Sequence, residues 1–123
     1  MKPTIKWNAD LFGVEIQTKE EHFVISAQPS MVMTWDDAVR YFDGDEEWQL
    51  PTLKQLEIVA EHIDDVNAIT KANGGYEIRS WHRTADECGE FYAWLVCMPG
   101  RTTASGNKLG DYYVRAVFAL KVK

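Results

Sequence analysis

The chain has 123 residues, of which 46% are hydrophobic and 26% are charged, as expected for a single globular domain over residues 1–123. A chain of this length buries enough apolar surface to fold without disulfide bonds or a metal ion. Its formal net charge of −6 opposes binding to nucleic-acid phosphates, and its apolar runs are too short to span a bilayer. We therefore expect no nucleic-acid partner and no membrane insertion.

The N-terminal third predicts a β-hairpin. Polar and apolar residues alternate around Phe12–Ile16 and again around Phe23–Ile25, with the charged run Lys19–Glu21 between them. The first eight residues do not lead into an apolar segment, so we expect no signal peptide. This favours a cytoplasmic location.

Two helices are predicted next. Thr34-Trp35-Asp36-Asp37 has the form of a capping box and predicts a helix from about Trp35 to Phe42. A second start signal, Pro51-Thr52-Leu53-Lys54-Gln55, precedes an apolar stripe from Leu56 to Ile63. Residues 66–69 predict a further short turn of helix, which the glycines at 74 and 75 end.

The second half of the chain predicts strands at Glu77–Trp81, Glu90–Cys97 and Tyr112–Val122. Between the last two, Pro99–Gly110 contains turn-forming residues throughout, so we expect a long exposed connection there. A hairpin, two helices and then several strands indicate an α+β protein with two helices packed on an antiparallel sheet.

The predicted strands also suggest which side chains are buried. The segment Phe91–Val96 is apolar on both faces, so it should be a central strand whose rings, like those of Trp81 and Tyr112, lie in the core. Arg115 interrupts another apolar run. Because a buried charge needs partners, we predict a salt bridge or hydrogen bonds from Arg115 to loop carbonyls.

No calcium site is predicted. Asp43, Asp45 and Glu47 alternate like the start of a calcium-binding loop. However, Trp48 occupies the sixth position, which needs glycine, and Lys54 occupies the twelfth, which needs a bidentate glutamate. We interpret this segment as a solvated acidic loop.

The cysteines and histidines show no catalytic or metal-binding pattern. Cys88 and Cys97 bracket a predicted strand that would separate them by about 30 Å, so both thiols should be free. No Cys-x-x-Cys or Gly-x-Ser-x-Gly motif is present, and His22, His62 and His82 lack the spacing of a helical metal pair. We therefore expect no metal, no cofactor and no enzymatic activity.

Several short segments follow one another in an order found in a known family. They are Thr34–Ala38, Leu50–Leu56, the strand around Trp81, Ala93-Trp94, Asn107-Lys108 and Tyr112–Val117. This ordered set, over about residues 33–120, resembles the small bacterial domains of C-type lectin-like fold known as domains of unknown function or major paralogous domains. Those domains are similar in fold to formylglycine-generating enzymes and to retroelement-diversified phage tropism determinants.

The matched positions belong to the family's scaffold. Leu50-Pro51-Thr52 resembles its helix start, and Tyr113-Val114-Arg115 resembles its closing strand. The chain departs from the family at His82 and Arg83, where serines are usual, and it lacks both the calcium and sugar motifs of animal lectins and the cysteine arrangement of formylglycine-generating enzymes. The resemblance therefore implies a calcium-independent, non-enzymatic binding module.

In the diversified relatives, the ligand binds exposed late strands and their connecting loops. The same region of this chain is polar with little to bury, which independently favours a binding surface for a protein or a glycan. Such a module would serve adhesion or the tropism of a phage or mobile element, which also favours a virion-associated location. The matching residues are His82, Arg83, Glu90, Arg101, Thr102, Thr103, Ser105 and Asn107. Two alternatives stay open: an enzyme of the formylglycine-generating type and a structural subunit that forms oligomers through exposed rings.

Overall fold

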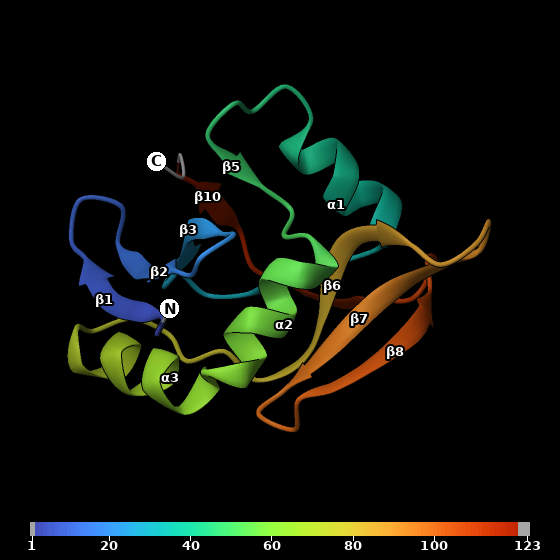
Figure 1. Ribbon diagram of the computed structural model, residues 1–123. Coiled ribbons are helices and arrows are strands. Elements are labelled where there is room, and N and C mark those ends of the chain that lie inside the picture. Colours follow the sequence, from blue (N-terminus) through green and yellow to red (C-terminus); the bar gives the residue numbers. More distant parts are fainter. Residues whose placement is uncertain (1, 121–123) are drawn as a thin grey trace.

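Two five-stranded β-sheets and three helices make up residues 2–120, the part of the chain that the computed structural model describes (Figure 1). All strand pairs are antiparallel except that of β6 (Ser80–Glu87) with β9 (Tyr112–Val114). The α+β class is confirmed, but two sheets replace the single one we expected.

The first sheet has the order β1 (Thr4–Asn8), β2 (Gly13–Gln17), β3 (His22–Ser26), β10 (Val117–Ala119) and β5 (Trp48–Gln49). The second has the order β4 (Met31–Met33), β9 (Tyr112–Val114), β6 (Ser80–Glu87), β7 (Tyr92–Met98) and β8 (Thr102–Asn107). The helices are α1 (Trp35–Phe42), α2 (Leu53–Glu61) and α3 (Ile63–Ala72).

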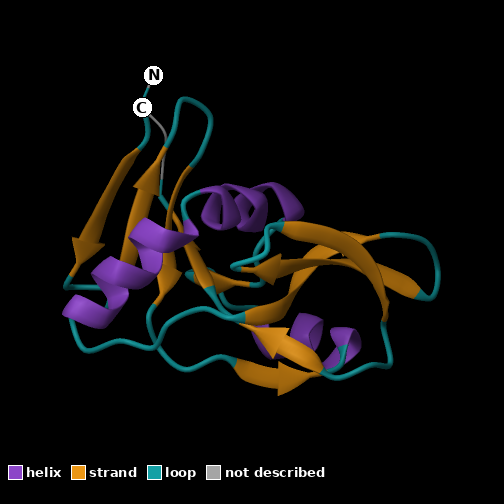
Figure 2. Cartoon of the chain, turned by 90° about the horizontal axis from the view of Figure 1, so that it is seen from below, coloured by secondary structure: helices purple, strands orange, loops and turns teal. Residues whose placement is uncertain are grey.

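The helices connect the two sheets through a shared core. Helix α3 packs on β1 and β2, whereas α2 packs on β6 and β7, and Figure 2 shows the strands in separate groups with the helices against them. A smaller cluster lies under α1 and includes Ala38, Phe42, Leu50 and Val114. The main core contains Val14, Ile16, Phe23, Ile25, Leu56, Val59, Ala60, Ile63, Val66, Ile78, Val96, Met98 and Val117.

Both predicted helix starts are confirmed, and α1 has the predicted bounds. The Thr34 hydroxyl accepts the backbone N–H of Asp37, and Thr52 and Gln55 form a complete capping box. These bonds satisfy N–H groups that have no partner inside the helix.

Helix α3 has ten residues, much more than the short turn we predicted. Asn67, a poor helix former in the middle of α3, is buried and binds the backbone of Ile78 through both ends of its amide, at 2.7 and 3.1 Å. The side chain therefore connects α3 to the segment before β6, a role that local helix propensity does not indicate.

The N-terminal hairpin of β2 and β3 and the central position of β7 are also confirmed. The half-exposed edge strand β1 was not predicted. The strand expected at Glu77–Trp81 begins only at Ser80, because the backbone at Tyr76–Ile78 binds the side chains of Asn67 and Arg115 instead of a neighbouring strand. Cys88 precedes β7, Cys97 lies near the far end of that strand, and both thiols are free, as expected.

The expected exposed connection at Pro99–Gly110 is wrong in part, because it contains the edge strand β8. One of its glycines is required by packing rather than by a turn. At Gly106, a Cβ atom would overlap the side chain of Leu95 and crowd the ring of Tyr112. Sequence composition alone does not distinguish these two uses of glycine.

The single strand expected at Tyr112–Val122 is also wrong within the described residues. The chain forms β9 in the second sheet, crosses at Arg115 and Ala116, and forms β10 in the first sheet.

The expected burial of the aromatic rings is also wrong in part. Trp81, Trp94 and Tyr112 are only half-buried, and Phe91 is 65% exposed. Phe91 lies in the turn before β7, beyond the part of the strand that neighbouring elements cover.

Arg115 lies at this crossing and is almost fully buried. Its guanidinium donates to the backbone carbonyls of Ser26 and Tyr76 at 2.9 Å and of Glu77 at 3.1 Å, and its Nε donates to Ser30 Oγ at 3.0 Å. Within residues 2–120 it forms no ion pair, so the predicted bonding to loop carbonyls is confirmed. Burial without a carboxylate lowers the pKa of Arg115 to about 10.

We predict that Arg115→Met lowers the free energy of unfolding by more than about 3 kcal/mol, because it leaves several buried acceptors without a donor. Urea unfolding followed by tryptophan fluorescence measures the change. Arg115→Lys, which keeps the charge and fewer bonds, should fall between the wild type and Arg115→Met. The exposed Arg40, paired with Asp37, provides the control, since Arg40→Met should cost less than about 1 kcal/mol. Equal stability of Arg115→Met and Arg40→Met would contradict this role.

Candidate functional site

The eight residues predicted to bind a ligand divide into two groups in the structure. Six are exposed, but His82 and Arg83 are completely buried, so the expectation that these two face a ligand is wrong. Both lie on β6, a strand with neighbours on both sides. The exposed residues are Glu90, Arg101, Thr102, Thr103, Ser105 and Asn107.

Arg83 fixes the backbone of the turn between β8 and β9. Its Nη2 donates to the carbonyls of Asn107 at 3.1 Å, Lys108 at 3.4 Å and Gly110, and its Nε donates to the carbonyl of Met33 at 3.1 Å. The guanidinium also lies 4.9 Å from the centroid of a tyrosine ring, that of Tyr112 on β9. Burial lowers the pKa of Arg83. We therefore regard Arg83 as a positioning residue for this turn.

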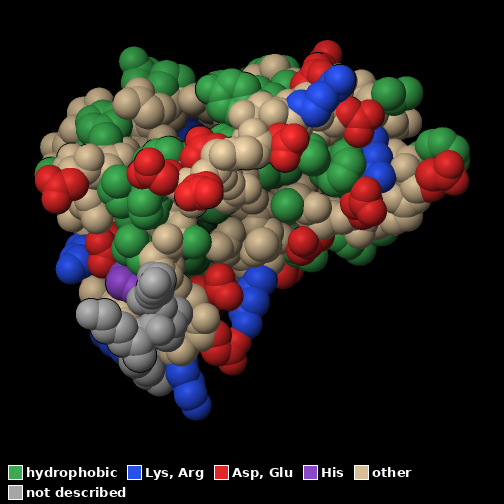
Figure 3. Space-filling model, turned by 90° about the horizontal axis from the view of Figure 1, so that it is seen from above, with side chains coloured by type: hydrophobic (Ala, Val, Ile, Leu, Met, Phe, Trp, Pro, Cys, Tyr) green, Lys and Arg blue, Asp and Glu red, His purple; other side chains and the backbone are tan. Residues whose placement is uncertain are grey.

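The exposed residues nearest to this turn form a surface at one end of the second sheet, which we call the tip surface. It surrounds an open hollow of about 460 Å³. Three large apolar side chains are exposed there: Phe91 by 65%, Tyr92 by 46% and Leu109 by 78%. The projecting right-hand end of the molecule in Figure 3 has hydrophobic and acidic side chains next to each other. The tip surface comprises Asp36, Glu90, Phe91, Tyr92, Asn107, Lys108 and Leu109.

Lys108 links the tip surface to the rest of the fold. Its Nζ is 3.1 Å from a carboxylate oxygen of Glu87 and 4.5 Å from the centroid of the Trp35 indole. Its backbone N–H donates to Phe91, and its carbonyl accepts from Trp35. Because Glu87 neutralises Lys108, whereas Asp36 and Glu90 form no ion pair within residues 2–120, the rim of the tip surface is acidic.

The structure brings together only two of the predicted residues here, Glu90 and Asn107. The side chain of Asn107 accepts the backbone N–H of Leu109 at 2.8 Å, and this bond shapes the turn that exposes Leu109. Arg101, by contrast, lies at the opposite end of β8, roughly 20 Å away for a six-residue strand. Near that end, Thr103 Oγ1 lies 3.4 Å from a carboxylate oxygen of Glu57 on α2.

Sequence analysis missed the apolar members of the tip surface. Phe91 and Tyr92 were assigned to the core because they begin an apolar run, although Gly89 and Glu90 indicate a turn directly before them. Leu109 lies between Lys108 and Gly110 in a run of turn-forming residues. A single apolar residue in such a run has no strand or helix to bury it, and this signal could have identified Leu109.

Ser30 and His82 have the hydrogen bond of a nucleophile and its base, but their surroundings oppose catalysis. Ser30 Oγ lies 2.8 Å from His82 Nε2, and His82 Nδ1 lies 3.2 Å from the carbonyl of Ser80, so Nδ1 donates and Nε2 accepts. Burial, with a smaller contribution from the charge of Arg115, lowers the pKa of His82 to about 4. A base in this position gains a proton only at a high energetic cost.

Three further features of the described residues concern metal ions, thiols and membranes. Within residues 2–120, no group of three or more His, Cys, Asp or Glu side chains is arranged to hold a metal ion. The thiols of Cys88, in the β6–β7 turn, and Cys97, near the far end of β7, do not form a pair. None of the helices in this part of the chain has the length and apolar character needed to cross a membrane.

Comparison with known proteins adds no family: no protein-family model and no curated protein matches this chain.

The burial of His82 predicts a pH dependence of stability. Its pKa is about 4 in the folded protein and near 6.5 in the unfolded chain, so between these values only the unfolded chain binds the proton. The free energy of unfolding should therefore fall as the pH is lowered from about 6.5 to about 4, by about 3 kcal/mol in total from this group.

Urea unfolding of the wild type and of His82→Gln at several pH values measures this effect. The variant should lose much of the pH dependence in this range. The partly exposed His62 provides the matched control, and His62→Gln should keep it. The same pH dependence in the wild type and His82→Gln would show that His82 does not have the lowered pKa.

Proposed function

We propose that the protein is a calcium-independent, non-enzymatic binding module of C-type lectin-like fold, and that it binds a protein or glycan on the tip surface. The observation that supports this most strongly is the exposure of Phe91, Tyr92 and Leu109 together. The turn that exposes Leu109 is held by the buried side chain of Arg83 and by the side chain of Asn107. Exposed apolar clusters with a polar rim are typical of interaction sites in soluble proteins.

Two features support the finer fold assignment. The order of elements agrees with the order of the matched segments: the capped helices α1 and α2 come first, and the strands β6 to β9 follow. In addition, Leu50-Pro51-Thr52 directly precedes α2, and Tyr113-Val114-Arg115 includes the end of β9. These are the scaffold positions of the resembling family.

The rigidity of the tip surface favours binding over an accidental apolar patch. Its backbone is hydrogen-bonded between β7 and the β8–β9 turn, and Arg83 binds that turn from inside the protein. A surface that is ordered before binding loses less conformational entropy when a ligand binds. This arrangement is suitable for an adhesion or tropism module, which must recognise a surface ligand without further folding.

We predict that Phe91→Ser combined with Leu109→Ser weakens ligand binding at least about tenfold, because both side chains would lose apolar contact with the ligand. Both are exposed, so the fold should be kept. The labelled protein is applied to a printed glycan array and to a panel of intact bacterial cells, and bound fluorescence is measured. Chelation of calcium with EDTA should leave binding unchanged.

Tyr76→Ser is the matched control, since Tyr76 is also exposed but lies outside the tip surface. It should bind like the wild type. Binding that the double variant retains in full would exclude the tip surface, and loss of binding with EDTA would exclude calcium independence. Wild-type protein that binds neither array nor cells would contradict the proposed function as tested.

The exposed rings also fit the alternative of an oligomeric structural subunit. Size-exclusion chromatography with light scattering distinguishes the two. A monomer at all concentrations supports the binding module, whereas a dimer that Phe91→Ser with Leu109→Ser converts to a monomer supports the structural subunit.

A further inference from the structure

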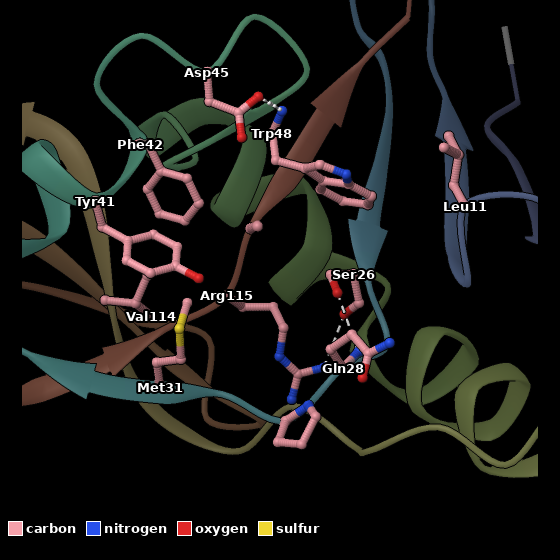
Figure 4. A pocket seen from close by; sticks show the side chains of 12 residues that line it. Leu11, Ser26, Gln28, Met31, Tyr41, Phe42, Asp45, Trp48, Val114 and Arg115 are labelled. Atoms are coloured by element: carbon pink, nitrogen blue, oxygen red, sulfur yellow. Dashed lines mark hydrogen bonds between the residues drawn. The ribbon is translucent and has the colours of Figure 1, made fainter.

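A second hollow, of about 420 Å³, lies at the C-terminal end of α1 and shares no lining residue with the tip surface, which contains Asp36 at the start of this helix. We call it the α1–β5 hollow. Figure 4 shows the Tyr41 and Phe42 rings on one side of it and the Trp48 indole on another. Met31 also lines it, and the stem of Arg115 crosses below the rings. Rings and aliphatic groups thus form the walls on the side of α1 and β5, whereas Ser26, Gln28 and Asp45 add polar groups to the lining. The hollow has room for one large side chain.

The aromatic rings of the hollow are supported from behind. Trp48 packs edge-to-face on Phe118 of β10 with centroids 5.4 Å apart, and Tyr41 packs in the same way on Phe42 at 4.9 Å. Phe42 is buried, whereas Tyr41 is 61% exposed. In Figure 4 the Tyr41 hydroxyl points toward the Arg115 stem across the open space. Tyr41 is thus a ring whose outer face a ligand can cover.

The charge of Arg115 does not make the hollow an anion site. Each of its three guanidinium nitrogens already donates to an oxygen of the protein, namely Ser30 Oγ and the carbonyls of Ser26, Tyr76 and Glu77. An incoming anion would have to compete with these bonds. What Arg115 offers to the hollow is its aliphatic stem, which is an apolar surface.

The rim of the hollow is acidic on the side of α1. The loop after α1 contains Asp43, Asp45, Glu46 and Glu47, all exposed, and Asp45 lines the hollow itself. Within residues 2–120, none of these four carboxylates forms an ion pair. The face in Figure 3, viewed from above α1 and β5, has acidic side chains interspersed with hydrophobic ones. A cationic partner would be attracted to this rim.

From the aromatic walls and the acidic rim together, we infer that the α1–β5 hollow binds a basic polypeptide segment that inserts one large apolar side chain between Tyr41 and Trp48. Because the inserted side chain is uncharged, the positive charge of the buried Arg115 does not repel it. The basic residues on either side of it lie against the acidic loop. Such an anchor in a pocket, surrounded by complementary charge, is the usual arrangement of a peptide-binding hot spot.

Three unlabelled peptides with blocked ends test this inference: KKWKK, in which a tryptophan is flanked by lysines, and its variants KKAKK and EEWEE. They are titrated into ¹⁵N-labelled protein, and the indole N–H signal of Trp48 is followed by NMR. KKWKK should bind at least about tenfold more tightly than KKAKK, because of its anchor, and than EEWEE, because of its charge. Raising the salt from about 20 to about 200 mM should weaken KKWKK severalfold.

Tyr41→Ser should weaken KKWKK about tenfold without unfolding the protein, since this ring is mostly exposed. Glu46→Gln with Glu47→Gln should weaken it less and reduce its salt dependence. Phe91→Ser on the tip surface is the matched control and should have no effect, so failure of this inference is distinguishable from failure of the tip surface. Equal binding of the three peptides, tighter binding of EEWEE, no change at Trp48, or unchanged affinity in Tyr41→Ser would each overturn the inference.

Discussion

The buried guanidinium of Arg115 is the interaction on which the arrangement of the two sheets depends. The chain passes between the sheets four times, and Arg115 lies on one of these crossings while its hydrogen bonds reach two others, between β3 and β4 and between α3 and β6. These bonds satisfy oxygens at the end of β3 and in the segments that connect the sheets. Because the acceptors are carbonyls and a hydroxyl rather than a carboxylate, the geometry of three backbone segments is set by a single side chain.

Arg83 serves the second sheet in the same way. Its guanidinium donates hydrogen bonds to carbonyls of the β8–β9 turn and of the end of β4, and these bonds fix the turn that exposes Leu109. His82, its neighbour on β6, stays neutral and accepts a hydrogen bond from Ser30, which in turn accepts one from Arg115. These two buried side chains of β6 thus support the fold, whereas the two proposed binding surfaces consist of exposed rings and acidic rims.

This division explains why the site was harder to predict than the helices. The capping residues Thr34 and Thr52 act on N–H groups three residues away, so their roles are visible in a short stretch of sequence. Arg83, by contrast, binds Met33 and Asn107, which are 50 and 24 residues away. A polar residue with such distant partners is indistinguishable, in sequence, from one that faces a ligand.

By itself, the sequence determined the α+β class, the hairpin of β2 and β3, the start of α1 and α2, and the need of Arg115 for partners, which the structure shows to be backbone carbonyls and a hydroxyl. Those features depend on local periodicity, on capping and on the cost of burying an unpaired charge. Only the tertiary structure decided that β8 is a strand, that β9 and β10 belong to different sheets, and that Phe91 and Leu109 are exposed while Arg83 is buried. The reason is that strand pairing and burial are properties of neighbours in space, and the neighbours of these residues come from distant parts of the chain.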